Sequence, residues 1–292
     1  SKFHPVLLKH QCGEATVRVV EYESRRVKLL EKELKLSQGQ LVARGSAVTA
    51  EERTKLEREE LRHLHVLERQ DRLLQLCLLM LWSLAEDYAV QQQLVKQRLC
   101  HLLAALLWRR TDELLITALG FLHKLSIFEQ NKDVLVEDAD AMAQLADLVG
   151  HESAGVAHAA LRLCYNLAFD ARAREAFVLK TCLLAKLPGA LQAQGCRKAA
   201  LRLLGSLAAD AALRSAVVSR YQACPQLALQ VALKCKEAVD PESAAMAVDL
   251  AADEVCASAL VEADSFPKAA ARAAQTGDPL LLRVVRHAVS HP

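Results

Sequence analysis

Aromatic residues, proline and glycine are all scarce in this chain. Aromatic side chains make up 4% of the 292 residues although 52% are hydrophobic, so any core must consist mainly of Leu, Ala and Val. That mixture favours packed helices over sheets. The 7 prolines and 10 glycines are few for a sandwich or barrel, which needs a turn about every ten residues. The composition therefore predicts an all-α chain.

An excess of one charge is also lacking. The formal net charge is +2, whereas a domain that binds nucleic acid through its phosphates is normally strongly basic. The longest apolar run, residues 73–85, is interrupted by Gln75 and Ser83 and is shorter than the roughly 20 residues that a membrane span needs. We expect a buried helix there, no membrane insertion and no nucleic-acid partner.

The cysteines do not form close pairs. An odd number without a C-x-x-C motif predicts free thiols, mostly buried, rather than a disulfide framework. Such thiols are typical of a reducing, cytosolic compartment. The 9 cysteines are Cys12, Cys77, Cys100, Cys164, Cys182, Cys196, Cys224, Cys235 and Cys256.

Motifs for catalysis or metal binding are missing as well. The chain contains no glycine-rich phosphate loop, nucleophile elbow or H-E-x-x-H helix, so we expect neither an enzyme nor a cofactor. His63 and His65 are two residues apart, which places them on different faces of a helix. His4, His10 and Cys12 lack a second ligand pair at a suitable spacing, so no metal site is predicted.

One short phrase recurs along the chain and marks an internal repeat. Its shared leucine recurs at spacings of 41, 42, 40 and 43 residues, within the period of armadillo and HEAT repeats. A weaker sixth copy ends near Ala288. Each copy contains helices separated by polar residues, and we expect Asp170 and Asp210 to cap the helices that follow them. The marked leucines are Leu84, Leu125, Leu167, Leu207 and Leu250.

The repeats predict a single elongated solenoid. Apolar positions three and four residues apart form one broad stripe on each helix, which a lone helix pair cannot bury and a stack of repeats can. We assign about five to six repeats to residues 74–292. Gly120 and Gly205 lie inside predicted helices, where we expect them to permit close helix packing.

Residues 1–73 have a different pattern. A helix is predicted from about Glu14 to Leu36, followed by a flexible loop over about 37–48 that contains two glycines. A capping box at Thr49–Glu52 begins a long charged helix that is expected to continue into residues 73–85. Together these elements predict a long, hairpin-like helical insertion. A coiled-coil contact through residues 51–70 is the alternative for the charged helix.

Several stretches resemble the kinesin-associated protein family, the non-motor armadillo subunit of heterotrimeric kinesin-II. They occur in the family's order, and the most specific is FLHKLSIFEQNK at 121–132. The family continues past the end of this chain, so we expect a fragment of a longer array. The similar stretches are residues 3–10, 19–23, 84–87, 121–132, 161–170 and 278–283.

The resemblance implies a fold and a function. The fold is an armadillo-repeat, right-handed superhelical solenoid. The function is that of a non-catalytic adaptor, which binds the C-terminal tails of the two kinesin-II motor chains and links them to cargo such as intraflagellar transport trains. The implied location is the cytoplasm, on microtubules and in the cilium or flagellum.

In an armadillo array the third helix of each repeat lines a concave groove. The residue before the shared leucine and the residue four positions earlier point into it. An Asn side chain can donate to and accept from a peptide backbone, and Lys or Arg can bind carboxylates. We therefore hypothesise a basic groove for an acidic segment of a motor tail or cargo; the alternative is a solvated wall. The predicted groove residues are Lys124, Arg162, Asn166, Arg202, Ser206, Asp249, Arg283 and His287.

Two other binding proteins fit the repeat. A nuclear transport receptor of the armadillo type would need regular Trp and Asn residues in the groove, with acidic residues to receive basic signals. The predicted groove lacks Trp and contains more basic than acidic residues, which favours the adaptor. A HEAT scaffold without a groove peptide is the other alternative.

Overall fold

The computed structural model describes residues 12–44, 49–86, 98–233 and 240–290. Every regular element in these ranges is helical and none is a strand, which confirms the all-α prediction. The chain forms two compact units, residues 1–135 (unit 1) and 136–292 (unit 2), each treated by itself below. Helix α3 (Ala50–Leu84) continues past residue 73 without a break, as expected for the long charged helix. None of the helices in the described ranges is long and apolar enough to cross a membrane.

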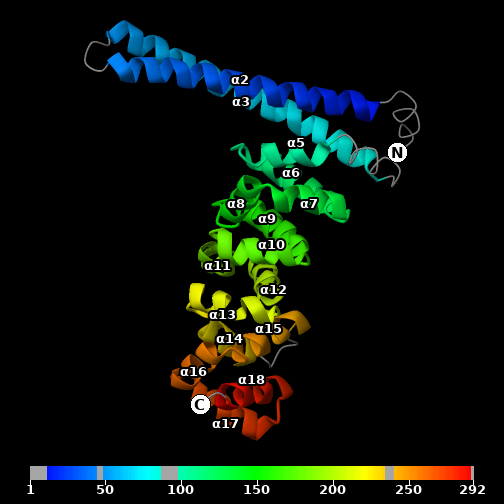
Figure 1. Cartoon of the computed structure of the whole chain (residues 1–292), viewed down its shortest axis with the longest axis vertical. Coiled ribbons are helices and arrows are strands. Elements are labelled where there is room, and N and C mark those ends of the chain that lie inside the picture. Colours follow the sequence, from blue (N-terminus) through cyan, green and yellow to red (C-terminus); the bar gives the residue numbers. More distant parts are fainter. Residues whose placement is uncertain (1–11, 45–48, 87–97, 234–239, 291–292) are drawn as a thin grey trace. The chain divides into compact units, whose positions relative to one another are not determined.

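Five helices belong to unit 1 and twelve helical elements to unit 2 among the described residues (Figure 1). Those of unit 1 are α2 (Cys12–Arg44), α3 (Ala50–Leu84), α5 (Leu99–Leu106), α6 (Asp112–Leu125) and α7 (Glu129–Glu137), the last of which ends just inside unit 2. Those of unit 2 are α8 (Ala139–Leu148), α9 (Ala154–Leu167), α10 (Ala171–Glu175), the π-helix η2 (Ala176–Lys180), α11 (Leu183–Gln192), α12 (Arg197–Ala208), α13 (Ala211–Arg220), α14 (Cys224–Leu233), α15 (Pro241–Ala251), α16 (Glu254–Glu262), α17 (Phe266–Thr276) and α18 (Pro279–Ser290).

Helices α2 and α3 form the predicted hairpin, with 33 and 35 residues lying side by side (Figure 1). The capping box at its second helix is confirmed, because Thr49 accepts from the backbone N–H of Glu52 and the Glu52 carboxylate accepts from the N–H of Thr49. Near the other end, Gln70 donates to the buried Glu23 carboxylate at 2.6 Å. The two helices therefore pair within the chain, in antiparallel orientation.

The predicted loop over about 37–48 is wrong for its first eight residues. Helix α2 continues to Arg44, while residues 45–48 lie outside the described residues. The extension packs on α3, where Gln38 donates to Glu60 at 2.8 Å. An interior glycine such as Gly39 destabilises a helix by only about 1 kcal/mol relative to Ala. Packing against a neighbouring helix offsets a cost of this size. The glycines indicated a break that tertiary packing removes.

Close contacts join α3 to α6 inside unit 1. The buried Asp71 carboxylate accepts from the Thr111 hydroxyl at 2.6 Å and forms an ion pair with Arg109 at 3.0 Å. Further along, a Cβ on Gly120 would lie 2.8 Å from the Trp82 ring. Glycine at 120 therefore permits the close approach that the sequence predicted.

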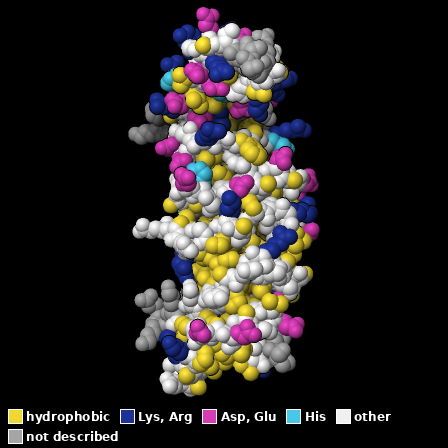
Figure 2. All heavy atoms as spheres, turned by 90° about the vertical axis from the view of Figure 1, so that its left-hand side faces the viewer, with side chains coloured by type: hydrophobic (Ala, Val, Ile, Leu, Met, Phe, Trp, Pro, Cys, Tyr) yellow, Lys and Arg dark blue, Asp and Glu magenta, His cyan; other side chains and the backbone are white. Residues whose placement is uncertain are grey.

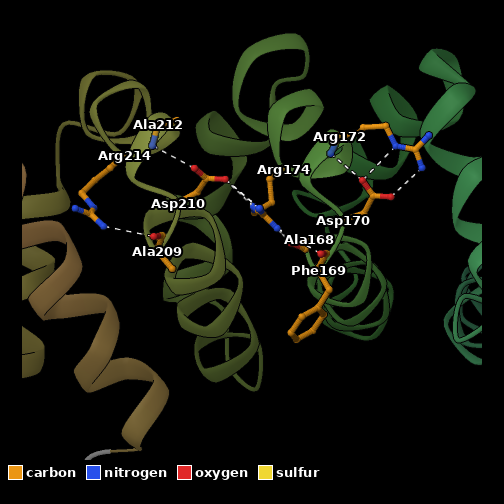
Figure 3. A network of polar contacts seen from close by, with 9 residues as sticks. All are labelled: Ala168, Phe169, Asp170, Arg172, Arg174, Ala209, Asp210, Ala212 and Arg214. Atoms are coloured by element: carbon orange, nitrogen blue, oxygen red, sulfur yellow. Dashed lines mark hydrogen bonds and ion pairs between the residues drawn. The ribbon is translucent and has the colours of Figure 1, made fainter.

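The repeat residues have the predicted structural roles. The five marked leucines are at most 1% exposed. Asp170 and Asp210 cap α10 and α13 by accepting from backbone N–H groups two residues on, which confirms the capping prediction (Figure 3). Gly205 lies against Met246, whose Cβ would be 3.1 Å from an added Cβ.

Arginines tie successive repeats of unit 2 together (Figure 3). Arg174 donates to the carbonyl of Ala168 at 3.0 Å, at the end of α9, and to the Asp210 carboxylate at 3.1 Å. One repeat later, Arg214 donates to the carbonyl of Ala208 at 2.8 Å. Each arginine satisfies carbonyl groups that the end of a helix leaves without partners. Helices α9 and α12 are thereby held at their C-terminal ends.

The eight described cysteines are all free. Five are buried, whereas Cys12, Cys77 and Cys182 are half-buried; Cys235 lies outside the described residues. Burial raises the thiol pKa of Cys100, Cys224 and Cys256 to about 12. A thiol with so high a pKa is a poor nucleophile at neutral pH, so these side chains serve as core residues.

Candidate functional site: the groove of the repeats

The third helices of unit 2 leave two hollows between them. On the side that Figure 2 shows, where α11, α13 and α16 of unit 2 lie, apolar side chains gather on the surface. The first hollow lies among α9, α12 and α15 and has a volume of about 460 Å³; the second lies between α15 and α18 and measures about 440 Å³. The first is lined by Tyr165, Ala168, Phe169, Arg174, Arg202, Gly205, Ser206, Ala209, Asp210, Glu242, Ala245, Met246 and Asp249. The second is lined by Pro241, Ala244, Ala245, Val248, Asp249, Pro279, Leu280 and Arg283.

The positive charge of Arg202 is balanced within the first hollow. Its Nε forms an ion pair with Glu242, and its second terminal nitrogen lies 3.6 Å from Asp240. Lys198 lies 3.7 Å from the same Asp240 oxygen. Because two carboxylates face these two cations, this part of the groove presents no net positive charge.

Aromatic side chains form one wall of the first hollow. The Tyr165 hydroxyl donates to the Glu242 carboxylate at 3.3 Å, and its ring meets that of Phe169 edge-on with 5.2 Å between centroids. Burial, and next the negative charge of Glu242, raise the pKa of Tyr165. Phe169 is 63% exposed and thus available for apolar contact. The hollow combines an aromatic wall with hydrogen-bonding carboxylates.

Asp249 lies where the two hollows meet. Burial raises its pKa, while the positive charges of Arg214 and His287 oppose that shift. The Arg214 guanidinium lies 3.8 Å from the carboxylate. Arg283, on the far side of the second hollow, is exposed. The predicted residues Asp249, Arg283 and His287 therefore belong to one neighbourhood.

The remaining predicted residues are placed differently. Arg162 is exposed and forms no ion pair within the part of the chain that the structure describes, and Asn166 is half-buried on the same helix. Lys124 belongs to unit 1, where its ammonium lies 6.0 Å from the centroid of the Trp82 ring. The structure thus brings Arg202, Ser206 and Asp249 together in the first hollow, whereas Lys124 belongs to the other unit.

Comparisons with known proteins agree with this geometry. The family model described as kinesin-associated protein (KAP) matches residues 1–292, the whole chain. The chain belongs to the kinesin-associated protein family. An engineered protein of known crystal structure is 19% identical with a TM-score of 0.57, covering 75% of this chain and 93% of its own. A designed armadillo repeat protein in complex with the peptide (KR)4 is 17% identical with a TM-score of 0.56 and the same coverages.

These likenesses establish the fold of this KAP-family chain. Both structures are under 25% identical to it, so they bear on architecture alone. The chain is an all-α solenoid of the armadillo type, as the repeat period predicted. Membership of the family, likewise predicted from the stretches quoted above, is confirmed.

Sequence reasoning missed several groove residues of this family member. Glu242 was overlooked because only two positions per repeat were considered, and it lies three residues before Ala245, the counterpart of Arg202 in the next repeat. Tyr165 and Phe169 lie beside the considered positions on α9 and at its end. Trp82, next to Ser83, packs against Phe121 with ring centroids 5.6 Å apart. Helices that cross at an angle bring Tyr165, Phe169 and Glu242 to the first hollow, which a straight repeat alignment does not reveal.

The described residues of this KAP-family chain include no group that could form a metal centre. Within the described ranges, no three His, Cys, Asp or Glu side chains are grouped so that they could hold an ion. His63 lies beside a hollow of the α2–α3 hairpin, and His65 lies 3.7 Å from Glu68. His4 and His10 lie outside the described residues.

Proposed function

We propose that this KAP-family chain is a non-catalytic adaptor that binds the C-terminal tails of the two kinesin-II motor chains. On this proposal it links the motor to cargo, including intraflagellar transport trains, and acts in the cytoplasm, on microtubules and in the cilium or flagellum. The family match over residues 1–292 is the observation that carries the proposal. The repeat groove, with two hollows in unit 2, provides a surface for extended peptide.

The charges of the groove favour an acidic tail segment at two places. Arg162 and Arg283 are exposed and form no ion pair with any residue of the described ranges. Arg202, by contrast, is already bound to Glu242, so it shapes the hollow rather than offering a free charge. The exposed Phe169 adds an apolar contact. The proposed ligand is therefore a segment that combines carboxylates with a large apolar residue.

Binding to co-expressed C-terminal tails of a heterodimeric kinesin-II pair tests the proposal. We expect the purified chain to retain the tails in a pull-down at low salt and to lose them as salt rises, since exposed charge pairs are screened. Arg162→Glu with Arg283→Glu should weaken binding by about tenfold or more, a loss of about 1.4 kcal/mol. Lys268→Glu on α17, which is exposed and lines neither hollow, is the matched control.

Two results would count against this function. A folded chain that retains no tail at any salt concentration contradicts the adaptor proposal. Selective capture of a basic peptide such as (KR)4, with no capture of the tails, supports the transport-receptor alternative instead. Salt-resistant tail binding unaffected by the arginine variants keeps the adaptor and moves the interface to apolar surfaces outside the groove.

A further inference from the structure

Two carboxylates face the groove of unit 2 from the start of α15. Asp240 is the N-cap residue of this helix, and Glu242 stands in its first turn. The start of a helix favours negative charge, because its unpaired backbone N–H groups carry a partial positive charge. Both side chains lie within reach of α12, where Arg202 forms ion pairs with them. The first turn of α15 therefore contributes negative charge to the wall of the first hollow.

Glu242 has partners on both of the third helices that precede α15. Its carboxylate forms an ion pair with the Nε of Arg202 on α12 and accepts a hydrogen bond from the Tyr165 hydroxyl on α9 at 3.3 Å. Helix α9 packs on α12, and α12 packs on α15. Since these three helices form the first hollow, Glu242 joins all of its walls.

The Glu242 carboxylate takes the place that a carboxylate of a ligand would have on Arg202. Arginine binds carboxylates through charge-assisted hydrogen bonds, and here that capacity is used within the chain. The other arginine of the lining, Arg174, is likewise paired, with Asp210 at 3.0 Å. An acidic side chain that entered the hollow would lose its water without gaining a cation, which is unfavourable. The first hollow therefore disfavours acidic residues of a ligand.

The surface beside Glu242 suits an apolar side chain instead. Phe169 is 63% exposed and meets the Tyr165 ring edge-on, while Ala245 and Met246 complete the apolar part of the lining. The hollow of about 460 Å³ falls within the range of about 300–1,000 Å³ that is typical of ligand pockets. A large apolar residue of a bound segment can therefore lie against Phe169.

Unpaired positive charge lies on both sides of the first hollow along the repeats. Arg162 precedes Tyr165 by three residues on α9, and Arg283 lies on α18, which packs on α15. Both side chains are exposed and form no ion pair with any residue of the described ranges. Packed helices are about 8–10 Å apart, so the three steps from α9 to α18 correspond to about eight residues of extended chain. One short segment can therefore reach both arginines.

We propose that Glu242 determines the ligand specificity of the groove of unit 2. By binding Arg202 it excludes acidic side chains from the first hollow, so the bound segment carries a large apolar residue there, against Phe169. Acidic residues on either side of that residue reach Arg162 and Arg283. The proposal rests on the function proposed above, in which this groove binds the tail segment. It adds the order of residues in that segment and the side chain that selects it.

Two synthetic peptides that differ at one position test this specificity. Each is a fluorescent extended peptide of about ten residues with paired Asp at both ends, Ser and Thr between them, and either Phe or Asp in the middle. Titration with the full chain, followed by fluorescence anisotropy, is expected to show about tenfold tighter binding of the Phe peptide. The Asp peptide carries the greater negative charge, so attraction to the outer arginines alone would favour it instead.

Glu242→Gln separates the role of this carboxylate from the net charge of the chain. The substitution releases Arg202, so binding of the Asp peptide should become about fivefold tighter, while that of the Phe peptide changes by less than about twofold. The matched control is Glu254→Gln, which removes the same charge from the first turn of α16. Glu254 is exposed and lines neither hollow, so this control should alter neither peptide's affinity.

Phe169→Ala tests the apolar contact independently. It should weaken binding of the Phe peptide by about fivefold and leave that of the Asp peptide unchanged, because only the first peptide contacts the ring. Circular dichroism and thermal unfolding check that each variant keeps its helix content and stability. Loss of Phe-peptide binding in a folded Phe169→Ala variant places the apolar residue in the first hollow.

Three outcomes would overturn the proposal. They are binding of neither peptide, equal binding of the two peptides to the wild-type chain, and an equal gain for the Asp peptide in Glu242→Gln and Glu254→Gln. The motor tails distinguish these failures from failure of the adaptor function. Retained tails with any of the three outcomes leave the adaptor in place and remove the specificity. Peptides that behave as expected while the tails are not retained keep the specificity and contradict the adaptor.

Discussion

The phenol of Tyr165 on α9 donates a hydrogen bond to the carboxylate of Glu242 on α15, 77 residues later in the chain. Helix α12 supplies Arg202, which forms an ion pair with the same carboxylate. Glu242 therefore connects three successive repeats at one point. This cluster determines the charge of the first hollow, because the Glu242 carboxylate balances the positive charge of Arg202, which lines the hollow from α12.

Glu242→Gln should lower the pKa of Tyr165 toward its ordinary value. The substitution removes the negative charge that, after burial, contributes most to raising this pKa. Spectrophotometric titration of the tyrosinates, with Tyr165→Phe to identify the signal of this residue, measures the effect. An unchanged Tyr165 titration in Glu242→Gln would mean that the two side chains do not interact in solution.

Gly120→Ala should destabilise unit 1, because a methyl group there would lie 2.8 Å from the Trp82 ring. Overpacking of this kind costs about 1–3 kcal/mol. Thermal or urea unfolding measures the loss, and Trp82→Leu in the same chain should recover part of it. Gly39→Ala is the control: nothing lies within 4 Å of its added Cβ, so the helix should gain up to about 1 kcal/mol. Equal stability changes in the two variants would rule out the close contact.

Arg109→Met should destabilise unit 1 more than a surface substitution does. It leaves the buried Asp71 carboxylate without its cation, 3.0 Å away, and a broken buried ion pair costs about 3–5 kcal/mol. Asp71→Asn with Arg109→Met removes the stranded charge and should be more stable than Arg109→Met alone. Urea unfolding of both variants distinguishes these cases. If the single variant unfolds like the wild type, Asp71 is hydrated in solution.

In the native state, the buried thiols should resist labelling by thiol reagents at alkaline pH. The pKa values of Cys100, Cys224 and Cys256 are raised to about 12, so these groups stay protonated at pH 9. A disulfide reagent at pH 9 should label the half-buried cysteines first and these three only after unfolding. Mass spectrometry of the labelled chain identifies the sites, and rapid native labelling of any of the three would contradict their burial.

The same pKa shifts predict a loss of stability at high pH. Unfolding returns each thiol to an ordinary pKa of about 8.5. Above that pH the unfolded chain binds fewer protons than the native one, so the free energy of unfolding decreases as pH rises toward 12. Urea unfolding at pH 8 and pH 10, with Cys224→Ala as a control that removes one such thiol, measures the decrease. If the free energy of unfolding decreases just as much in Cys224→Ala, groups other than the Cys224 thiol cause the decrease.

Local patterns in the sequence predicted the repeat architecture and its caps. Leu167 and Leu207 recur one period apart because every repeat must bury the same apolar stripe. Asp170 and Asp210 each cap a helix by accepting a hydrogen bond from the backbone N–H two residues later in the chain. Gly120 was predictable as a point of close approach for the same local reason, since glycine inside a helix otherwise has a cost. The eight residues after Leu36 were predicted to be loop because Gly39 and Gly45 favour a break in a helix, whereas α2 continues to Arg44 and packs on α3.

The groove was predictable in outline and not in charge. Counting positions from the repeated leucine finds Arg202 and Asp249, which do line the first hollow. The same counting does not predict that Arg202 forms ion pairs with Glu242 and Asp240. Those ion pairs depend on how the first turn of α15 packs against the middle of α12. The basic groove stays a prediction, to which Arg162 and Arg283 contribute exposed charges.

By itself, the sequence determined that this protein is a stack of helical repeats preceded by a hairpin, because helix period, repeat spacing and capping residues act over a few neighbouring positions. Only the tertiary structure decided which charges are balanced and which apolar residues stay exposed. Arg202 is neutralised by a helix one repeat away, and Leu29 and Leu36 remain uncovered on a helix whose other face is buried. Such outcomes depend on distances between helices, which no local pattern of residues encodes.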